Sequence, residues 1–104
     1  MTTIRILQIR DIAGTDYAFR GFDPAKFNIE DYELRYTLES DDLDDKEDLD
    51  VLETVFHIFN MRIPKDFTGH SLSTSDCLHI ERDGKCRLYY CDNFGWELVK
   101  EVRA

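Results

Sequence analysis

Residues 77–91 read CLHIERDGKCRLYYC, two strand-like runs that meet at Asp83-Gly84. An Asp-Gly pair between two such runs is among the strongest sequence signals of a β-hairpin. A further strand-like run follows the turn formed by residues 92–95. The last third of the chain is therefore predicted to be an antiparallel β-meander with strands over residues 76–82, 85–91 and 96–102.

The register of this hairpin decides which of its side chains share a face of the sheet. A two-residue turn pairs Arg82 with Lys85 and divides the apolar side chains between both faces. A three-residue loop with Gly84 as the bulge residue pairs Glu81 with Lys85 instead. A slip of one residue moves every side chain to the other face, so the hydrophobic pattern should decide. It favours the bulged loop, which gathers on one face Leu78, Ile80, Cys86, Leu88 and Tyr90, and on the other Cys77, His79, Arg87, Tyr89 and Cys91.

The first two thirds of the chain predict two more strands and one helix. TIRILQIR, residues 3–10, indicates a strand that is buried on both faces or carries a bulge. DYELRYTLE, residues 31–39, alternates, so one face should carry Tyr32, Leu34, Tyr36 and Leu38. From about Asp44 to Asn60, helical spacing gives the apolar stripe Leu49, Leu52, Val55, Phe56 and Phe59. The predicted fold is a single α+β domain over residues 1–104, an antiparallel sheet of four to five strands with a C-terminal β-meander packed on one main helix.

Acidic residues are concentrated between positions 39 and 53. This segment holds nine of them against Lys46 alone, and so carries −8 of the net charge of −9. A solvated helix start is the favoured explanation of such a run, since charge runs are usually just solvated. The alternative is a functional surface, either a docking site for a basic partner or an imitation of a phosphate backbone. No basic cluster is present, so we expect no direct binding of nucleic acid. The candidate residues of an acidic surface are Asp41, Asp42, Asp44 and Asp45.

Neither a membrane span nor a secretion signal is recognisable. No apolar run approaches the roughly 18 residues of a transmembrane helix. The first ten residues, MTTIRILQIR, have Arg5 inside their apolar stretch and lack a small-residue cleavage site. An odd number of cysteines, three, then suggests reduced thiols. We expect a cytoplasmic protein without membrane binding.

GHSLS, residues 69–73, differs by one letter from the G-x-S-x-G nucleophile elbow of hydrolases. An elbow needs a buried strand before the serine and a helix directly after it. Here IPKDFT precedes the motif and STSDCLHI leads into a strand, so a turn shaped by polar side chains is the better interpretation. The alternative is a small hydrolase-like enzyme that uses His70, Ser71 and Asp76 or Asp92.

No set of metal ligands and no cofactor-binding motif stands out. In the bulged register Cys77, His79 and Cys91 share a face, but diagonal neighbours lie roughly 7–8 Å apart, which is loose for zinc. The acidic run lacks the central glycine of a calcium-binding loop. We expect no metal, no cofactor and no catalytic residue.

Two longer motifs resemble a known family, the YodL-like domain. PKDFTGHSLSTSD, residues 64–76, and LYYCDNFGW, residues 88–96, are similar to its pattern P-x-D-F-x-G-H-S-L-S-x-S-D followed by Y-Y-x-D-x-x-G-F. The segments YAFRGFD, DYELRY and the FN that ends the helix also fit, so the resemblance covers about Tyr17 to Val99. Three residues depart from the pattern, which weakens any metal role of the cysteines: Cys77, Cys91 and Trp96.

The resemblance implies a small bacterial domain that is often encoded in mobile elements and has no known catalytic activity. The positions carried over from the pattern are Asp66, Gly69, His70, Ser71, Leu72, Ser73, Ser75, Asp76, Tyr90, Asp92 and Gly95.

The absence of catalytic groups, the uneven charge and an aromatic residue at a turn favour a binding function. We expect a non-enzymatic protein–protein interaction domain, an accessory or regulatory factor of a bacterial mobile element, whose oligomeric state stays open. Besides the four aspartates of the acidic run, the candidate partner-binding residues are His70, Ser71, Ser73, Ser75, Asp76, Asp92 and Phe94.

Overall fold

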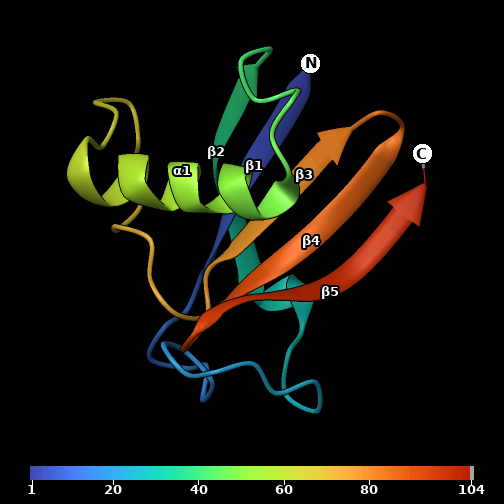
Figure 1. Cartoon of the computed structure of the whole chain (residues 1–104). Coiled ribbons are helices and arrows are strands. Elements are labelled where there is room, and N and C mark those ends of the chain that lie inside the picture. Colours follow the sequence, from blue (N-terminus) through green and yellow to red (C-terminus); the bar gives the residue numbers. More distant parts are fainter. Residues whose placement is uncertain (104) are drawn as a thin grey trace.

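One helix and five strands build the fold in the computed structural model, which describes residues 1–103 (Figure 1). This arrangement confirms the predicted α+β class. A short 3-10 turn, Ile29–Asp31, precedes the second strand. The other elements are β1 (Thr2–Ile9), β2 (Tyr32–Ser40), α1 (Asp48–Met61), β3 (Cys77–Arg82), β4 (Lys85–Asp92) and β5 (Gly95–Arg103).

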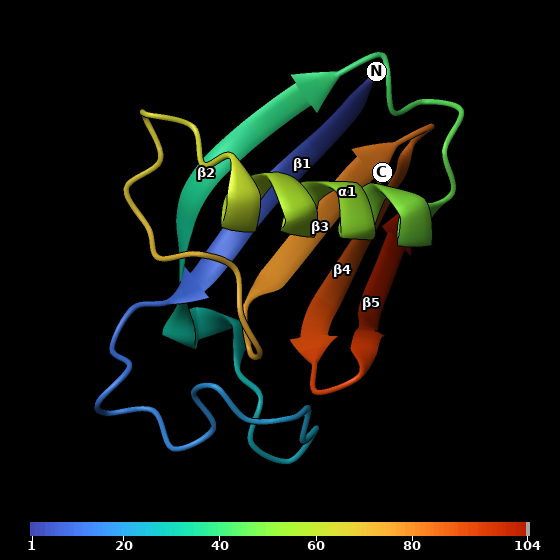
Figure 2. The same cartoon turned by 60° about the vertical axis from the view of Figure 1, so that its left-hand side comes forward.

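All five strands form one antiparallel sheet in the order β2-β1-β3-β4-β5 (Figure 2). The three C-terminal strands form the predicted β-meander. The N-terminal strand β1 lies between β2 and β3, and it is buried from both sides along part of its length. β2 and β5 are therefore the two edge strands.

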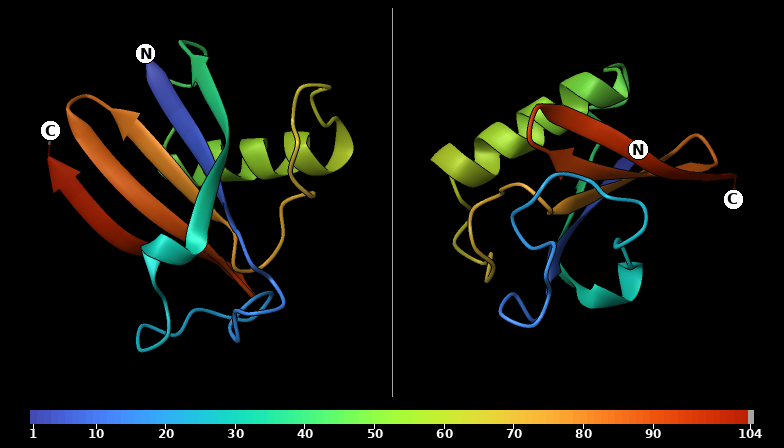
Figure 3. Two further views of the ribbon diagram at one scale, coloured as in Figure 1. Left: turned by 180° about the vertical axis from the view of Figure 1, so that it is seen from behind. Right: turned by 90° about the horizontal axis from the view of Figure 1, so that it is seen from below.

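The sheet is covered on both faces, by different parts of the chain (Figure 3). α1 crosses one face, and residues 10–31, which link β1 to β2, fold over one end of the other face. The cluster under α1 includes Ile4, Ile6, Val51, Leu52, Val55, Phe59, Leu78 and Ile80. The cluster under the 10–31 loop is built from Ile9, Tyr17, Tyr32, Cys77, Leu88 and Tyr90.

The two-sided core explains why the predicted hairpin register is wrong. Arg82 pairs with Lys85 across a two-residue turn, in which Asp83 and Gly84 have φ values of 52° and 71°. Two left-handed residues are typical of a type I′ hairpin turn. The apolar side chains divide between the faces because each face has its own apolar cover: Leu78 and Ile80 lie under α1, whereas Leu88 and Tyr90 lie under the loop.

A second correction concerns β2. Tyr36 lies opposite Ile6 but Leu34 lies opposite Leu7, so Arg35 is an extra residue, a β-bulge. The bulge turns the two halves of the strand to different faces. Tyr36 and Leu38 pack towards α1, Tyr32 belongs to the other cluster, and Leu34 is 52% exposed. The prediction that these four residues share one face is therefore wrong.

α1 begins four residues later than predicted, at Asp48 instead of Asp44. Its buried stripe includes Val51, while Leu49 is 58% exposed, contrary to the predicted stripe. The late start follows from the contacts of Asp48, whose carboxylate accepts hydrogen bonds from Arg82, Arg87 and Tyr89 on the hairpin. Among residues 1–103, no helix is long and apolar enough to cross a membrane.

Candidate functional site

The segment GHSLSTSD lies in the loop between α1 and β3, and its last residue is buried. Asp76 is 2% exposed. Its carboxylate oxygen Oδ2 accepts hydrogen bonds from the Ser73 amide at 3.0 Å and from Gln8 Nε2 at 3.1 Å. Its backbone carbonyl accepts from the Cys91 amide at 2.8 Å. Asp76 thus ties the loop to itself, to β1 and to the end of β4.

Gln8 of β1 is the centre of this polar cluster, and the sequence analysis missed it. Its fully buried amide Nε2 also donates to the His70 carbonyl at 2.8 Å. A Cβ atom on Gly69 would lie 2.0 Å from Gln8 Oε1, so a larger residue at position 69 would force the buried Gln8 side chain to move. A signal for Gln8 existed, because it is an uncharged polar residue inside the apolar run ILQI.

His70 lies at the rim of the cluster, partly exposed. Its Nδ1 is 2.7 Å from the Ser71 carbonyl oxygen and must donate there, because a carbonyl can only accept. Its Nε2 lies 3.8 Å from Asp76 Oδ1, beyond hydrogen-bond distance. The ring meets the edge of Phe19, with centroids 5.7 Å apart. Phe19 is half exposed, so His70 and Phe19 together are the solvent-facing part of this cluster.

Burial shifts the pKa of Asp76, the carboxyl group next to His70. Desolvation raises the pKa of Asp76 from 3.8 to about 6, against the opposing effects of the Ser73 amide, His70 and Gln8. The carboxyl is thus ionised at pH 7 but changes its charge close to that pH. Perturbed acids of this kind occur in catalytic sites and in structural networks alike, so the neighbouring groups must decide.

The serines do not complete a catalytic arrangement. Ser71 is exposed, and it presents its carbonyl to His70. The Ser75 hydroxyl accepts a hydrogen bond from the Phe19 amide at 2.9 Å, and the buried Ser73 hydroxyl has no partner within the described residues. None of the contacts formed within residues 1–103 joins a serine hydroxyl to the His70 ring. A nucleophile and its base should lie within about 2.6–3.2 Å of each other.

The remaining motif residues hold the 10–31 loop against the sheet. Ser75 has a left-handed φ of 82°, and its backbone carbonyl accepts a hydrogen bond from the Tyr32 hydroxyl at 2.5 Å. The Tyr90 hydroxyl donates to the Arg20 carbonyl at 2.7 Å, and Asp92 Oδ1 accepts from the Phe22 amide at 3.1 Å. Segments that are far apart in the sequence therefore meet around the end of β4.

A groove lies beside this junction, between α1, residues 72–74 and the β4–β5 turn, with a volume of about 440 Å³. We call it the helix–turn groove. Phe56 and Trp96 form one wall, with ring centroids 6.0 Å apart, and Trp96 Nε1 donates to Glu53 at 3.2 Å. Ser73 and Asp92 line it as well. In the turn next to the groove, Phe94 is 98% exposed.

Comparison with known families gives one match. A family model described as the YodL-like domain matches residues 3–102, nearly the whole chain. The chain belongs to the YodL-like domain family. No curated protein and no solved structure matches it. The YodL-like resemblance seen in the two motifs is thereby confirmed.

In this YodL-like domain the cysteines lie apart, and the prediction that Cys77, His79 and Cys91 share a face is wrong. Cys77 lies under the 10–31 loop, whereas Cys91 lines the helix–turn groove on the other face. Burial raises the pKa of the Cys77 thiol far above its ordinary value and that of Cys91 to about 12. Across the described residues, no three His, Cys, Asp or Glu side chains converge as metal ligands.

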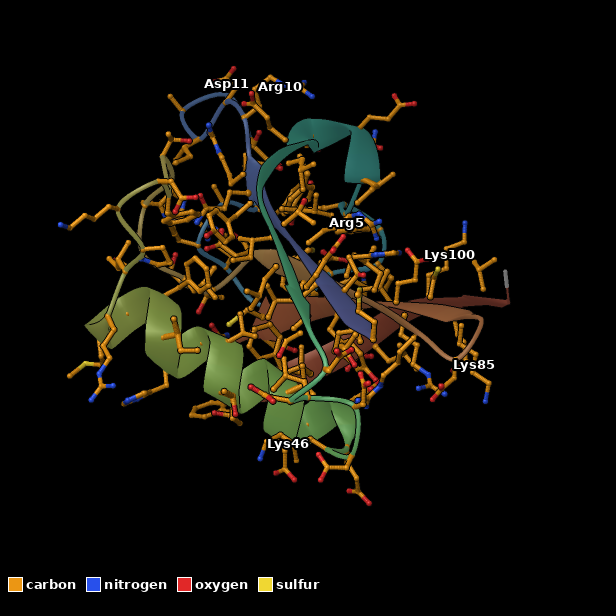
Figure 4. All side chains as sticks on the ribbon, turned by 90° about the horizontal axis from the view of Figure 1, so that it is seen from above. Arg5, Arg10, Asp11, Lys46, Lys85 and Lys100 are labelled. Atoms are coloured by element: carbon orange, nitrogen blue, oxygen red, sulfur yellow. The ribbon has the colours of Figure 1, made fainter. Side chains whose placement is uncertain are left out.

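Only part of the acidic segment of the YodL-like domain is available to a partner, because some of its carboxylates contact other groups of the chain. Asp44 accepts from the Thr2 hydroxyl at 2.7 Å and lies 3.0 Å from the N-terminal amino group, and these contacts lower its pKa. Asp41 lies farther from the same amino group, at 3.7 Å. Asp42 and Asp45 are exposed. Lys46, which follows Asp45 in the chain, lies beside the start of α1 (Figure 4). The four aspartates therefore divide into one that anchors the N-terminus and three that face solvent.

Proposed function

We propose that this YodL-like domain is a non-enzymatic protein-binding domain, and that it acts as an accessory or regulatory factor of a bacterial mobile element. The observation that carries the binding function is Phe94, which is 98% exposed in the turn beside the helix–turn groove. A fully exposed aromatic side chain next to a groove is typical of an anchor that a partner buries. The mobile-element context rests on the family resemblance alone.

The buried motif supports this proposal by giving the turn a rigid base. The Ser75 amide donates to the Cys91 carbonyl at 2.9 Å, and the Cys91 amide donates to the Asp76 carbonyl. Asp92 Oδ1 then accepts from the Asn93 amide at 2.8 Å, one residue before Phe94. His70, Ser73, Ser75, Asp76 and Asp92 would thus act by holding the binding surface in place, while Phe94 touches the partner.

The charge of the domain indicates the kind of partner. The chain carries −9, and Glu53 lies in the wall of the groove. A basic partner would be steered towards such a surface, and its association would slow as salt is added.

Replacing Phe94 by Ala tests the proposal. Once a partner is identified, we expect Phe94→Ala to weaken binding about tenfold or more, because hot-spot aromatics dominate interface energies. Met61→Ala is the matched control, since Met61 is also an exposed apolar residue (70%) but lies at the end of α1. Equal affinity of both variants in calorimetric titrations would refute the assignment of the surface.

A second candidate surface is the acidic segment, which the exposure of Asp41, Asp42 and Asp45 favours. If it mimics a phosphate backbone or docks a basic partner, changing the three aspartates to Asn should weaken binding and flatten its salt dependence. Unchanged affinity in such a salt titration would leave Phe94 as the better site. The hydrolase alternative stays a prediction. Among the described residues, no serine hydroxyl forms a hydrogen bond with the His70 ring that would support it.

A further inference from the structure

β5 is an edge strand whose outer side is free. It is nine residues long and pairs with β4 on one side, while no described strand pairs with its other side. A free edge presents a row of backbone N–H and C=O groups that can bind an extended peptide.

The two halves of this edge differ. Leu88 pairs with Lys100 but Tyr89 pairs with Leu98, so Val99 is an extra residue that kinks the strand. A bulge and a lysine are both known means of discouraging edge pairing. They lie in the second half of β5, whereas the first half, Gly95–Leu98, starts directly after Phe94 and carries neither.

An apolar shelf flanks this first half on the α1 side. Trp96 packs on Phe56, and Leu98 lies opposite Tyr89. The Tyr89 hydroxyl donates to Asp48 at 2.5 Å, which brings the start of α1 next to this part of β5. Leu98 is 47% exposed, and Leu49, the residue after Asp48, is 58% exposed. Apolar side chains of an added strand would find partners on this shelf.

The opposite face of the same half is acidic. Glu97 lies opposite Tyr90, which belongs to the face under the 10–31 loop, and Glu97 is exposed without an ion pair among the described residues. The nearest cation along the strand on that face is Lys100, beyond the bulge; Figure 4 shows it on the side of the sheet away from α1 and Lys46. A basic side chain of an added strand would therefore be attracted to Glu97.

We propose that the Gly95–Leu98 edge of β5 binds an extended segment of a partner protein in which apolar and basic side chains alternate. The apolar ones lie on the shelf of Trp96 and Leu98, and the basic ones lie beside Glu97. A second copy of the chain is the poorer occupant, because each copy carries −9 and antiparallel self-pairing centred on Glu97 would place the two Glu97 side chains opposite each other. This inference deepens the proposed protein-binding function and rests on it.

The test uses the full chain and three capped heptapeptides. GVKVKVG reads the same in both directions, so it serves for parallel and antiparallel pairing. At about 1 mM peptide, we expect it to shift the backbone amide resonances of residues 95–98 and the Trp96 indole resonance. The charge-reversed GVEVEVG, and GVKVKVG methylated at alternate peptide nitrogens, should each bind about tenfold more weakly.

Matched variants localise the effect. Leu98→Gln should weaken binding of GVKVKVG, whereas Val102→Gln, at a site of nearly equal exposure (46%) beyond the bulge, should leave it unchanged. Equal binding of the three peptides, or shifts elsewhere than β5, would overturn the proposal. So would a dimer in analytical ultracentrifugation that Leu98→Gln dissolves, because the occupant would then be a second copy. If Phe94→Ala weakens binding of a natural partner while the peptides fail, the binding function stands and strand pairing is wrong.

Discussion

The pKa values of two aspartates of this domain are shifted in opposite directions. Asp76 has a raised pKa because desolvation outweighs its hydrogen bonds. At Asp48 desolvation also raises the pKa, but the hydrogen bonds and charges of Tyr89, Arg82 and Arg87 outweigh it, so the pKa is lowered. The difference lies in the partners, since Asp48 meets two guanidinium groups and Asp76 meets an amide and an imidazole.

The pH dependence of stability should show this difference. Asp76 has a pKa near 3.8 when unfolded and about 6 when folded, so the folded state binds more protons between these values and loses stability as the pH rises from about 4 to 6. Asp76→Asn removes this effect and keeps acceptors for Ser73 and Gln8. Relative to wild type, we expect the free energy of unfolding of this variant to improve by about 2 kcal/mol between pH 4.5 and pH 7. The unfolding free energies are measured by urea titration at the two pH values. The same difference between wild type and Asp76→Asn at both values would contradict a buried Asp76 with a raised pKa.

Gly69 gives a second test at this scale. A Cβ atom would lie 2.0 Å from Gln8 Oε1 and 2.8 Å from Phe67 Cζ, so Gly69→Ala should cost about 1–3 kcal/mol of unfolding free energy. Thr68→Ala, at the exposed neighbour, should change it by less than about 0.5 kcal/mol. A Gly69→Ala protein with wild-type stability in chemical denaturation would show that the Gln8 amide does not pack against residue 69.

At the scale of elements, one carboxylate joins α1 to the β3–β4 hairpin. Asp48 begins the helix and binds Arg82, Arg87 and Tyr89, which all belong to the hairpin. Its own pKa is lowered, so its contribution to stability is present above its unfolded pKa and is lost as the pH falls through the folded one. This anchor fixes the helix start and, with it, the shelf beside β5.

Asp48→Asn should therefore destabilise the fold by about 2–3 kcal/mol, because it removes the carboxylate that pairs with Arg82 and one of the two that pair with Arg87, which keeps Glu101. Asp45→Asn removes the same charge three residues earlier, at an exposed position, and should have an effect below about 0.5 kcal/mol. Thermal unfolding of both variants followed by circular dichroism distinguishes them. Equal effects would mean that net charge, and not the anchor, governs stability here.

The sequence predicts the strands and the helix of this fold well, but it predicts the faces of the strands poorly. From the alternation of apolar and polar residues, we predicted one apolar face for β2 and one for the β3–β4 hairpin. Both predictions are wrong, because the apolar side chains of each divide between the two faces. The reason is that the 10–31 loop covers the second face of the sheet, so apolar side chains can be buried on either face. A bulge such as that at Arg35 leaves no clear trace in the sequence either, because it depends on the partner strand β1.

At the scale of the whole molecule, the motif segments meet around the end of β4 although they lie far apart in the chain. The sequence could indicate that GHSLSTSD shapes a turn, and the buried Asp76 and Ser75 are consistent with that interpretation. It could not indicate Gln8 as the shared partner, because that contact spans more than sixty residues. The place of Phe94 in a turn predicted that its side chain is exposed, and in the structure it is 98% exposed.

The most direct test of the binding function is photo-crosslinking in the native cell. A photoreactive phenylalanine analogue at position 94 should give one specific adduct with a partner protein, and the same analogue at position 61, which is also exposed, should give none. The adduct from position 94 should also disappear when Trp96 is changed to Ala. Identical adducts from both positions, or none from position 94 in a folded and expressed protein, would contradict a partner-binding surface at the β4–β5 turn.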